Sequence, residues 1–147
     1  MASVLIIENN TFFRKSFKEI LKMYLPQLPI EEAASAREGL EKIDERLPDI
    51  IFMDIHLSGK NGLELSREIK RNHPDIVVNI FTNYDLPEYR ETAYRYGVDH
   101  FILKDALSGA AIAELIMGML EDKKRAPRPT LCGFISTEYL WGTSASG

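Results

Sequence analysis

Polar side chains that could act together on a phosphoryl group follow the short apolar segments of the sequence. They are Glu8, Asn9 and Asn10 after the first segment, Asp54 after a second, Thr82 and Asn83 after a third, and Lys104 after a fourth. A carboxylate can accept a group covalently, and oxygen ligands suit a hard divalent cation such as Mg²⁺. Hydroxyl and ammonium groups can stabilise a phosphoryl group during its transfer. The residue types therefore indicate phosphoryl chemistry, provided that the fold brings these segments together.

The segments that must position these side chains alternate between apolar runs and amphipathic stretches. The apolar runs predict strands at 4–7, 50–53, 76–81 and 101–103, with a weaker one near 30–34, and helical periodicity predicts helices over 11–25, 35–46, 62–72, 87–96 and 107–124. Five strand–helix pairs with short connections predict a parallel sheet with helices on both faces. Ligands bind such sheets at the carboxyl ends of the strands, so we expect the polar residues to meet at one rim.

The composition is typical of a globular protein with one domain. Of the 147 residues, 45% are apolar and 27% are charged. The net charge of −4 argues against a nucleic-acid surface, and no segment approaches the ~20 apolar residues of a membrane span. The single cysteine, Cys132, is typical of a reducing compartment. We therefore expect a cytoplasmic protein that binds neither nucleic acid nor membranes.

The sequence changes character after residue 125. The segment 126–147, "APRPTLCGFISTEYLWGTSASG", has two prolines, three glycines and no helical period. We expect one folded domain over 1–125, followed by a tail over 126–147 that is too short to form an output domain.

Four motifs, "VLIIENN", "PDIIFMDIHLSGKNGLEL", "NIFTN" and "YGVDHFILKDA", resemble in order and spacing the receiver domain of bacterial two-component response regulators. The resemblance covers roughly residues 3–124, and the "KDA" ending is most similar to receivers attached to helix–turn–helix outputs of the nitrate-regulator type. It implies an α/β, flavodoxin-like fold: a doubly wound five-stranded parallel sheet in the order 2-1-3-4-5. It also implies a regulatory phosphoacceptor in signal transduction rather than an enzyme that acts on an external substrate.

The resemblance assigns a role to each residue of the rim. Asp54 would be the phosphoacceptor, Thr82 the switch hydroxyl, and Lys104 the partner of phosphoryl or Asp54 oxygens. Phe101 would be the aromatic side chain that rotates with the switch. The implied Mg²⁺ ligands are Glu8, Asn9, Asp54 and the main-chain carbonyl of His56.

The resemblance also implies partners. The phosphoryl group would come from a histidine kinase or a phosphotransfer protein. In the family, the face of the fourth helix, fifth strand and fifth helix often carries partner or homodimer contacts, whereas nitrate-regulator-like receivers pair through the first and fifth helices. The sequence favours neither of these two surfaces.

The sequence departs from the family pattern around the predicted site. Receivers usually have a second acid where Asn9 stands, so we expect Mg²⁺ to bind less firmly here. Ser58 replaces the usual Pro, and Asn83 replaces a small residue. In the loop after Asp54, the Asn61-Gly62 pair predicts a turn with positive φ.

These departures leave a second reading open, a degenerate receiver that acts as a phosphorylation-independent binding or dimerisation module. A third, a flavodoxin-like mononucleotide binder, would need a glycine-containing phosphate loop after the first strand. The corresponding segment, "ENNTFF", has no glycine.

Overall fold

The computed structural model describes residues 2–106 and 108–124. It comprises two compact units, Met1–Met117 and Gly118–Gly147. Every predicted site residue belongs to the first unit, and the described part of the second, residues 118–124, is helical. The predicted tail over 126–147 lies outside the described residues, so the predicted boundary at 125 stays a prediction.

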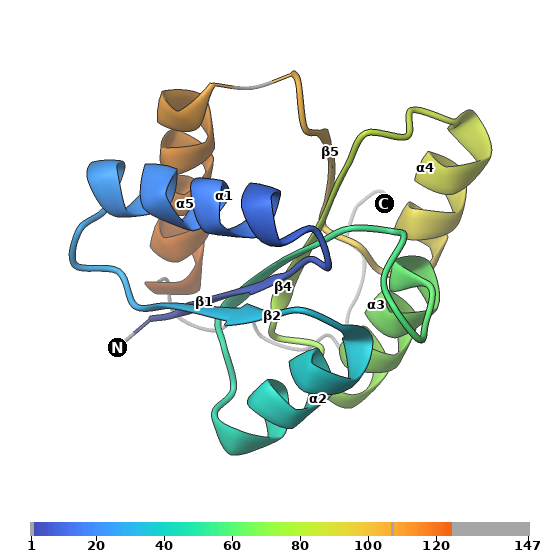
Figure 1. Ribbon diagram of the computed structural model, residues 1–147. Helices are drawn as coiled ribbons and strands as arrows, with labels where there is room; N and C mark the ends of the chain where they lie inside the picture. Colours follow the sequence, from blue (N-terminus) through green and yellow to red (C-terminus); the bar gives the residue numbers. More distant parts are fainter. Residues whose placement is uncertain (1, 107, 125–147) are drawn as a thin grey trace, which may run out of the picture. The chain divides into compact units, whose positions relative to one another are not determined.

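Strands and helices alternate along the described chain, and the strands form one parallel sheet (Figure 1). The elements are β1 (Val4–Ile7), α1 (Thr11–Tyr24), β2 (Ile30–Ala33), α2 (Ala36–Glu45), β3 (Ile50–Met53), α3 (Gly62–Asn72), β4 (Val77–Thr82), α4 (Pro87–Arg95), β5 (His100–Leu103) and α5 (Gly109–Lys124). The order across the sheet is β2-β1-β3-β4-β5, which confirms the predicted doubly wound α/β fold.

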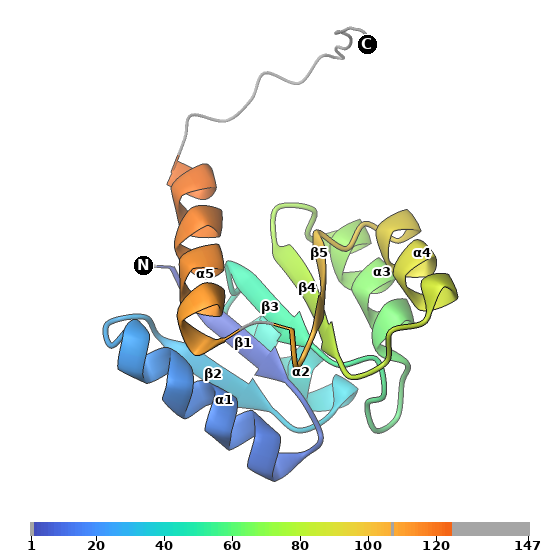
Figure 2. The same ribbon diagram turned by 90° about the horizontal axis from the view of Figure 1, so that it is seen from above.

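The two faces of the sheet pack against different helices. In the first unit, α1 and the start of α5 cover one face, and α2, α3 and α4 cover the other (Figures 1 and 2). Successive strand side chains point to opposite faces. Leu5 and Ile7 of β1 therefore enter the core on the α2–α3 side, whereas Phe52 of β3 meets Phe17 of α1 at 5.3 Å between ring centroids. Burial on both faces explains why the strands are almost purely apolar.

The structure confirms the predicted helices and strands. The largest difference between a predicted and an observed boundary is at the start of the last helix. The sequence predicts a start at 107, whereas α5 begins at Gly109. The Ser108 hydroxyl accepts a hydrogen bond from the Ala111 amide at 3.1 Å. A serine cap of this kind satisfies an amide of the first turn that has no partner within the helix.

The loop after β3 corrects one prediction. Positive φ occurs at Gly59, at 88°, and not at Gly62. Glycine is required at 62 for another reason, because a Cβ there would collide with the carbonyl oxygen of Asp54. The Asn61 side chain caps α3 by accepting a hydrogen bond from the Leu63 amide at 2.7 Å. Gly62 thus lets α3 begin in direct contact with the strand end that carries Asp54.

Candidate functional site

Three charged side chains from separate strand ends meet at the predicted rim. The Nζ of Lys104 lies 2.6 Å from Glu8 Oε1 and 2.9 Å from Asp54 Oδ2. The side chains of Lys104, Glu8 and Asp54 are only 7%, 4% and 10% exposed, respectively. They follow β5, β1 and β3 in the chain, so the parallel sheet brings together residues that lie as many as 96 positions apart. The sequence prediction that these three groups converge is confirmed.

The ion cluster keeps Lys104 charged. Burial alone would lower the pKa of the Lys104 ammonium, but the hydrogen bonds to Glu8 and Asp54 outweigh it and raise that pKa above its usual value. Two carboxylates and one ammonium leave the cluster with one net negative charge. That charge attracts a cation, whereas the ammonium offers a donor to phosphoryl oxygens.

The loop from Glu8 to Asn10, which we call the acid loop, makes hydrogen bonds to β2, within itself and to the start of α1. The Glu8 amide donates to the Ala33 carbonyl of β2 at 3.0 Å, and Glu8 Oε2 accepts from the Asn10 amide at 3.0 Å. The Asn10 side chain caps α1 by accepting from the Phe13 amide at 2.9 Å. Asn9 lies between them with an exposed side chain. Asn9 is therefore accessible from solvent.

Asp54 is held at the end of β3 by its neighbours. Its Oδ1 accepts a hydrogen bond from the Ile55 amide at 2.6 Å, and the Gly62 amide donates to the Ile55 carbonyl at 2.6 Å. His56, the next residue of this loop, is exposed and its ring lies 4.3 Å from that of Tyr84. The loop after β3 therefore borders the site and contacts the loop after β4.

Thr82 and Phe101 lie on the neighbouring strands. Thr82 is fully buried at the end of β4, its carbonyl accepts from the Lys104 amide at 2.8 Å, and its hydroxyl accepts from the Tyr84 amide at 3.3 Å. Phe101 of β5 is 7% exposed, with the Arg90 guanidinium 4.7 Å from its ring centre. Thr82 therefore lies at the rim next to Lys104, whereas Phe101 lies further back along β5, in the core that also contains Ala93 of α4. The switch roles of both residues stay predictions.

Phe13 of α1 encloses Lys104 from another side, and no sequence motif singles out this residue. The Lys104 Nζ lies 4.1 Å from the centre of the Phe13 ring, and this ring packs against Phe17 and Phe81. A cation over an aromatic face is attracted by the ring's quadrupole. The position of Phe13 in the first turn after the acid loop could have indicated this contact, because that turn borders the same rim.

Replacing Phe13 with Leu should lower the free energy of unfolding by about 0.5–2 kcal/mol, because the ammonium loses its aromatic partner. Phe12→Leu is the matched control: Phe12 is 83% exposed on the same helix turn, so its effect should stay within about 0.5 kcal/mol. Urea unfolding of both variants measures the difference. Equal free energies of unfolding for the two variants would show that the contact between Lys104 and Phe13 does not stabilise the fold.

The oxygen atoms at the rim suit a hard cation. The described residues hold no group of three or more His, Cys, Asp or Glu side chains that could bind a metal. The predicted ligand set instead combines two carboxylates, one amide and one main-chain carbonyl. Each carboxylate oxygen of Glu8 and Asp54 accepts one hydrogen bond, so each retains acceptor capacity. Mg²⁺, which keeps several waters and takes few protein oxygens, fits such a set.

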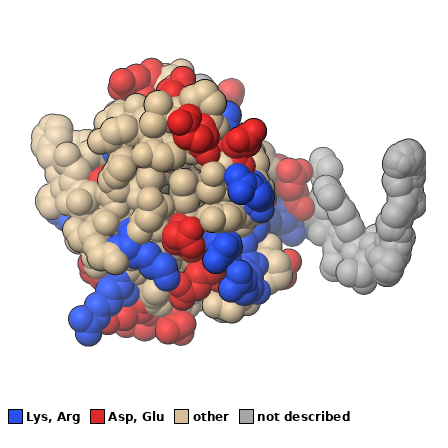
Figure 3. Space-filling model, turned by 90° about the vertical axis from the view of Figure 1, so that its right-hand side faces the viewer, with Lys and Arg blue, Asp and Glu red and all other residues tan. Residues whose placement is uncertain are grey.

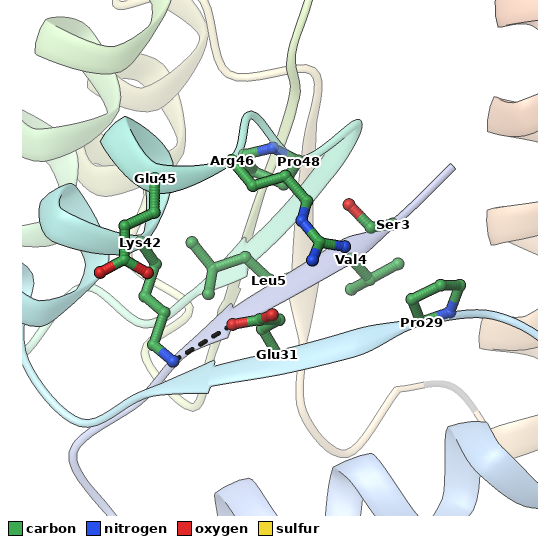
Figure 4. Close-up of a pocket in the computed structure, with 9 residues that line it drawn as sticks. All are labelled: Ser3, Val4, Leu5, Pro29, Glu31, Lys42, Glu45, Arg46 and Pro48. Atoms are coloured by element: carbon green, nitrogen blue, oxygen red, sulfur yellow. Dashed lines mark hydrogen bonds and ion pairs between the residues drawn. The ribbon is translucent and has the colours of Figure 1, made fainter. Parts of the chain in front are cut away.

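A separate cavity lies far from this rim, at the opposite ends of β1 and β2 (Figure 4). Its volume is about 140 Å³, and its lining includes Ser3, Pro29 and Arg46. The Lys42 ammonium pairs with Glu31 there at 3.1 Å. None of the predicted site residues lines this cavity, so it does not belong to the phosphoryl site.

Comparison with curated proteins identifies relatives that are longer than this chain. The chain is 27% identical over 124 residues to the nitrate/nitrite response regulator protein NarL of Escherichia coli (strain K12), covering 79% of this chain and 57% of that protein. It is 33% identical over 102 residues to a protein-glutamate methylesterase/protein-glutamine glutaminase of Geobacillus kaustophilus (strain HTA426), covering 69% of this chain and 29% of that protein. The chain spans about half the length of the first relatives it matches.

Solved structures share the fold. A CheY-like response regulator receiver domain protein from Methanospirillum hungatei JF-1 has a TM-score of 0.77 and 26% identity, covering 84% of this chain and 97% of that one. A DNA-binding response regulator of the LuxR family from Staphylococcus aureus has a TM-score of 0.74 and 28% identity, covering 81% and 98%. Within the described residues, no helix is both long and apolar enough to cross a membrane.

The family profile of the response regulator receiver domain matches residues 4–116, which include every rim residue described above. This match agrees with the resemblance of the four motifs and with the strand order of the sheet. The chain belongs to the response regulator receiver domain family.

Proposed function

We propose that Asp54 accepts a phosphoryl group from a histidine kinase or phosphotransfer protein in the cytoplasm, in a reaction that requires Mg²⁺. The observation that carries the proposal is the ion cluster, in which Lys104 bridges Asp54 and Glu8 at 2.9 and 2.6 Å. A phosphoacceptor needs a carboxylate next to a fixed cation, and this cluster provides both. The domain would turn over no external substrate, since its own carboxylate is the acceptor.

In this proposal a carboxylate oxygen of Asp54 attacks the phosphorus atom. The new oxygen–phosphorus bond forms as the bond from phosphorus to the donor breaks, and the donor leaves with the electron pair. The Lys104 ammonium would donate to a phosphoryl oxygen, and the Thr82 hydroxyl would turn to donate to another. Mg²⁺, held by Glu8, Asn9, Asp54 and the His56 carbonyl, would neutralise charge on the phosphoryl oxygens.

The phosphoryl group would change the surface near α4. Turning the Thr82 hydroxyl away from the Tyr84 amide would release a hydrogen bond of 3.3 Å in the β4–α4 loop. That loop and α4 expose Tyr84, Leu86 and Tyr94 by 46%, 43% and 49%. Figure 3, which looks at the side where α3 and α4 lie, shows a broad area without charged side chains. Exposed aromatic and aliphatic side chains such as these three suit a protein partner, including a second copy of the chain.

The intact ion cluster favours the phosphoacceptor over the phosphorylation-independent module. Replacing a buried ion cluster by apolar side chains is often neutral or even stabilising, so a lysine buried between two acids is better explained by phosphoryl chemistry than by a need for stability. The membership of the receiver family likewise favours a receiver over a mononucleotide binder.

Removal of the metal should abolish phosphorylation. We expect incubation of the chain with acetyl phosphate and Mg²⁺ to add one phosphoryl group, and incubation with acetyl phosphate and excess EDTA to add none, because uncompensated phosphoryl charge would be repelled by Glu8 and Asp54. Intact mass spectrometry measures both. Equal labelling in EDTA would contradict the metal's role, and unmodified protein in both samples would favour the binding module.

A further inference from the structure

Arg14 of α1 connects the acid loop to the edge strand of the sheet. Its Nη1 donates to the Glu8 carbonyl at 2.7 Å, and its Nε donates to Glu32 Oε1 on β2 at 2.9 Å. Arg14 is only 8% exposed. A buried guanidinium requires such partners, since leaving it unpaired is strongly destabilising. The side chain therefore has a defined position, set by one acceptor on each side.

Glu32 is a fixed anchor for this arginine. Besides Arg14, it pairs with Lys18 at 3.2 Å and with Lys15 at 3.4 Å. Burial alone would raise the pKa of the Glu32 carboxyl, but the hydrogen bonds from Arg14 and Lys18 outweigh it and lower that pKa. Glu32 thus stays charged at neutral pH and holds one edge of the guanidinium, leaving Nη1 directed at the acid loop.

Only arginine fits this arrangement. The guanidinium presents donors in a rigid plane, so one side chain can serve two acceptors that lie in different directions. A lysine at position 14 has a single flexible ammonium and could retain the charge pair with Glu32 without reproducing the rigid link to the Glu8 carbonyl. The substitution Arg14→Lys therefore keeps the positive charge next to Glu32 and removes the rigid link to the Glu8 carbonyl.

We infer that Arg14, oriented by Glu32, is a positioning residue that holds the acid loop in the conformation required for Mg²⁺ binding. The inference rests on the proposed function, because Glu8 and Asn9 of that loop are the proposed metal ligands. The carbonyl that Arg14 contacts belongs to Glu8 itself, and the following residue is Asn9. A shift of this main chain would therefore move both ligand side chains together.

The test is a Mg²⁺ titration of the full chain, followed through the amide NMR signals of Glu8 and Asn9. We expect saturable shifts in the wild type and about 10- to 100-fold weaker Mg²⁺ binding in Arg14→Lys, the range found when groups that orient metal ligands are removed. Lys15→Gln is the matched control, since Lys15 pairs with the same Glu32 but is 63% exposed and does not contact the loop. We expect its Mg²⁺ affinity to stay within about twofold of the wild type, because a solvent-exposed charge is screened.

A second variant, Glu32→Gln, retains Arg14 and removes only its charged anchor, and we expect its Mg²⁺ affinity to fall by less than that of Arg14→Lys. Unchanged affinity in both Arg14→Lys and Glu32→Gln, or an equal loss in Lys15→Gln, would overturn the inference. So would a wild type whose acid-loop signals do not respond to Mg²⁺. Phosphorylation is measured separately by mass, so failure of the proposed function is distinguished from failure of this inference.

Discussion

Replacing Lys104 with Met should lower the free energy of unfolding by about 3–5 kcal/mol, the range for removing one partner of a buried ion pair. The substitution preserves the length of the side chain but leaves Glu8 and Asp54 without their shared cation, and both residues are less than a tenth exposed. Urea unfolding measures the loss. Lys42→Met is the matched control, because Lys42 pairs with Glu31 at the protein surface, where solvent screening leaves an ion pair with little effect on stability.

Lys104→Met also distinguishes the contribution of the lysine to stability from its contribution to phosphorylation. Mg²⁺ should stabilise Lys104→Met more than it stabilises the wild type, since the metal then supplies the positive charge that both carboxylates lack. Phosphorylation by acetyl phosphate should nevertheless slow, because no ammonium remains to donate to the phosphoryl oxygens. Lys104→Met that is as stable as Lys42→Met, or that is phosphorylated at the wild-type rate, would contradict the role of the ion cluster.

Replacing Asn9 with Asp should strengthen Mg²⁺ binding by about 10- to 100-fold, as a third carboxylate adds on the order of 1–3 kcal/mol of attraction. Asn9 is exposed at the rim, so its side chain can turn toward a metal without disturbing the core. The titration described for the acid loop measures the change.

Asn10→Asp is the matched control for this substitution. It adds the same charge one residue further along, but the side chain at position 10 caps α1, and Asp is as good a cap as Asn. We expect a much smaller gain in Mg²⁺ affinity for Asn10→Asp. Equal gains in the two variants would show that net charge matters and that Asn9 is not a ligand.

The fold and the central ion cluster could be predicted from the sequence because they depend on patterns with few alternatives. Apolar runs between amphipathic helices permit a parallel sheet, and a parallel sheet places every strand's carboxyl end at one rim. The sequence therefore predicts that Glu8, Asp54 and Lys104 meet, because each directly follows a predicted strand. The order of the strands, in contrast, was implied only by the resemblance of four motifs to the receiver family.

The residues that support the cluster could not be predicted in the same way. Phe13 and Arg14 lie on a helix whose periodicity already explains an aromatic residue and a cation, and only the three-dimensional structure shows that they contact Lys104 and Glu8. Gly62 was expected to have positive φ, because an Asn-Gly pair usually forms a turn. Its actual role, the close approach to Asp54, depends on a contact that the local sequence does not encode.

The most direct test of the account is to locate the phosphoryl group. Wild-type chain and Asp54→Asn are incubated side by side with acetyl phosphate and Mg²⁺, and intact mass is followed by peptide mapping. The account predicts one adduct in the wild type, on the peptide that contains Asp54, and none in the variant, because an amide cannot replace the carboxylate nucleophile. An adduct of equal yield in Asp54→Asn, or an unmodified wild type at saturating Mg²⁺, would contradict it.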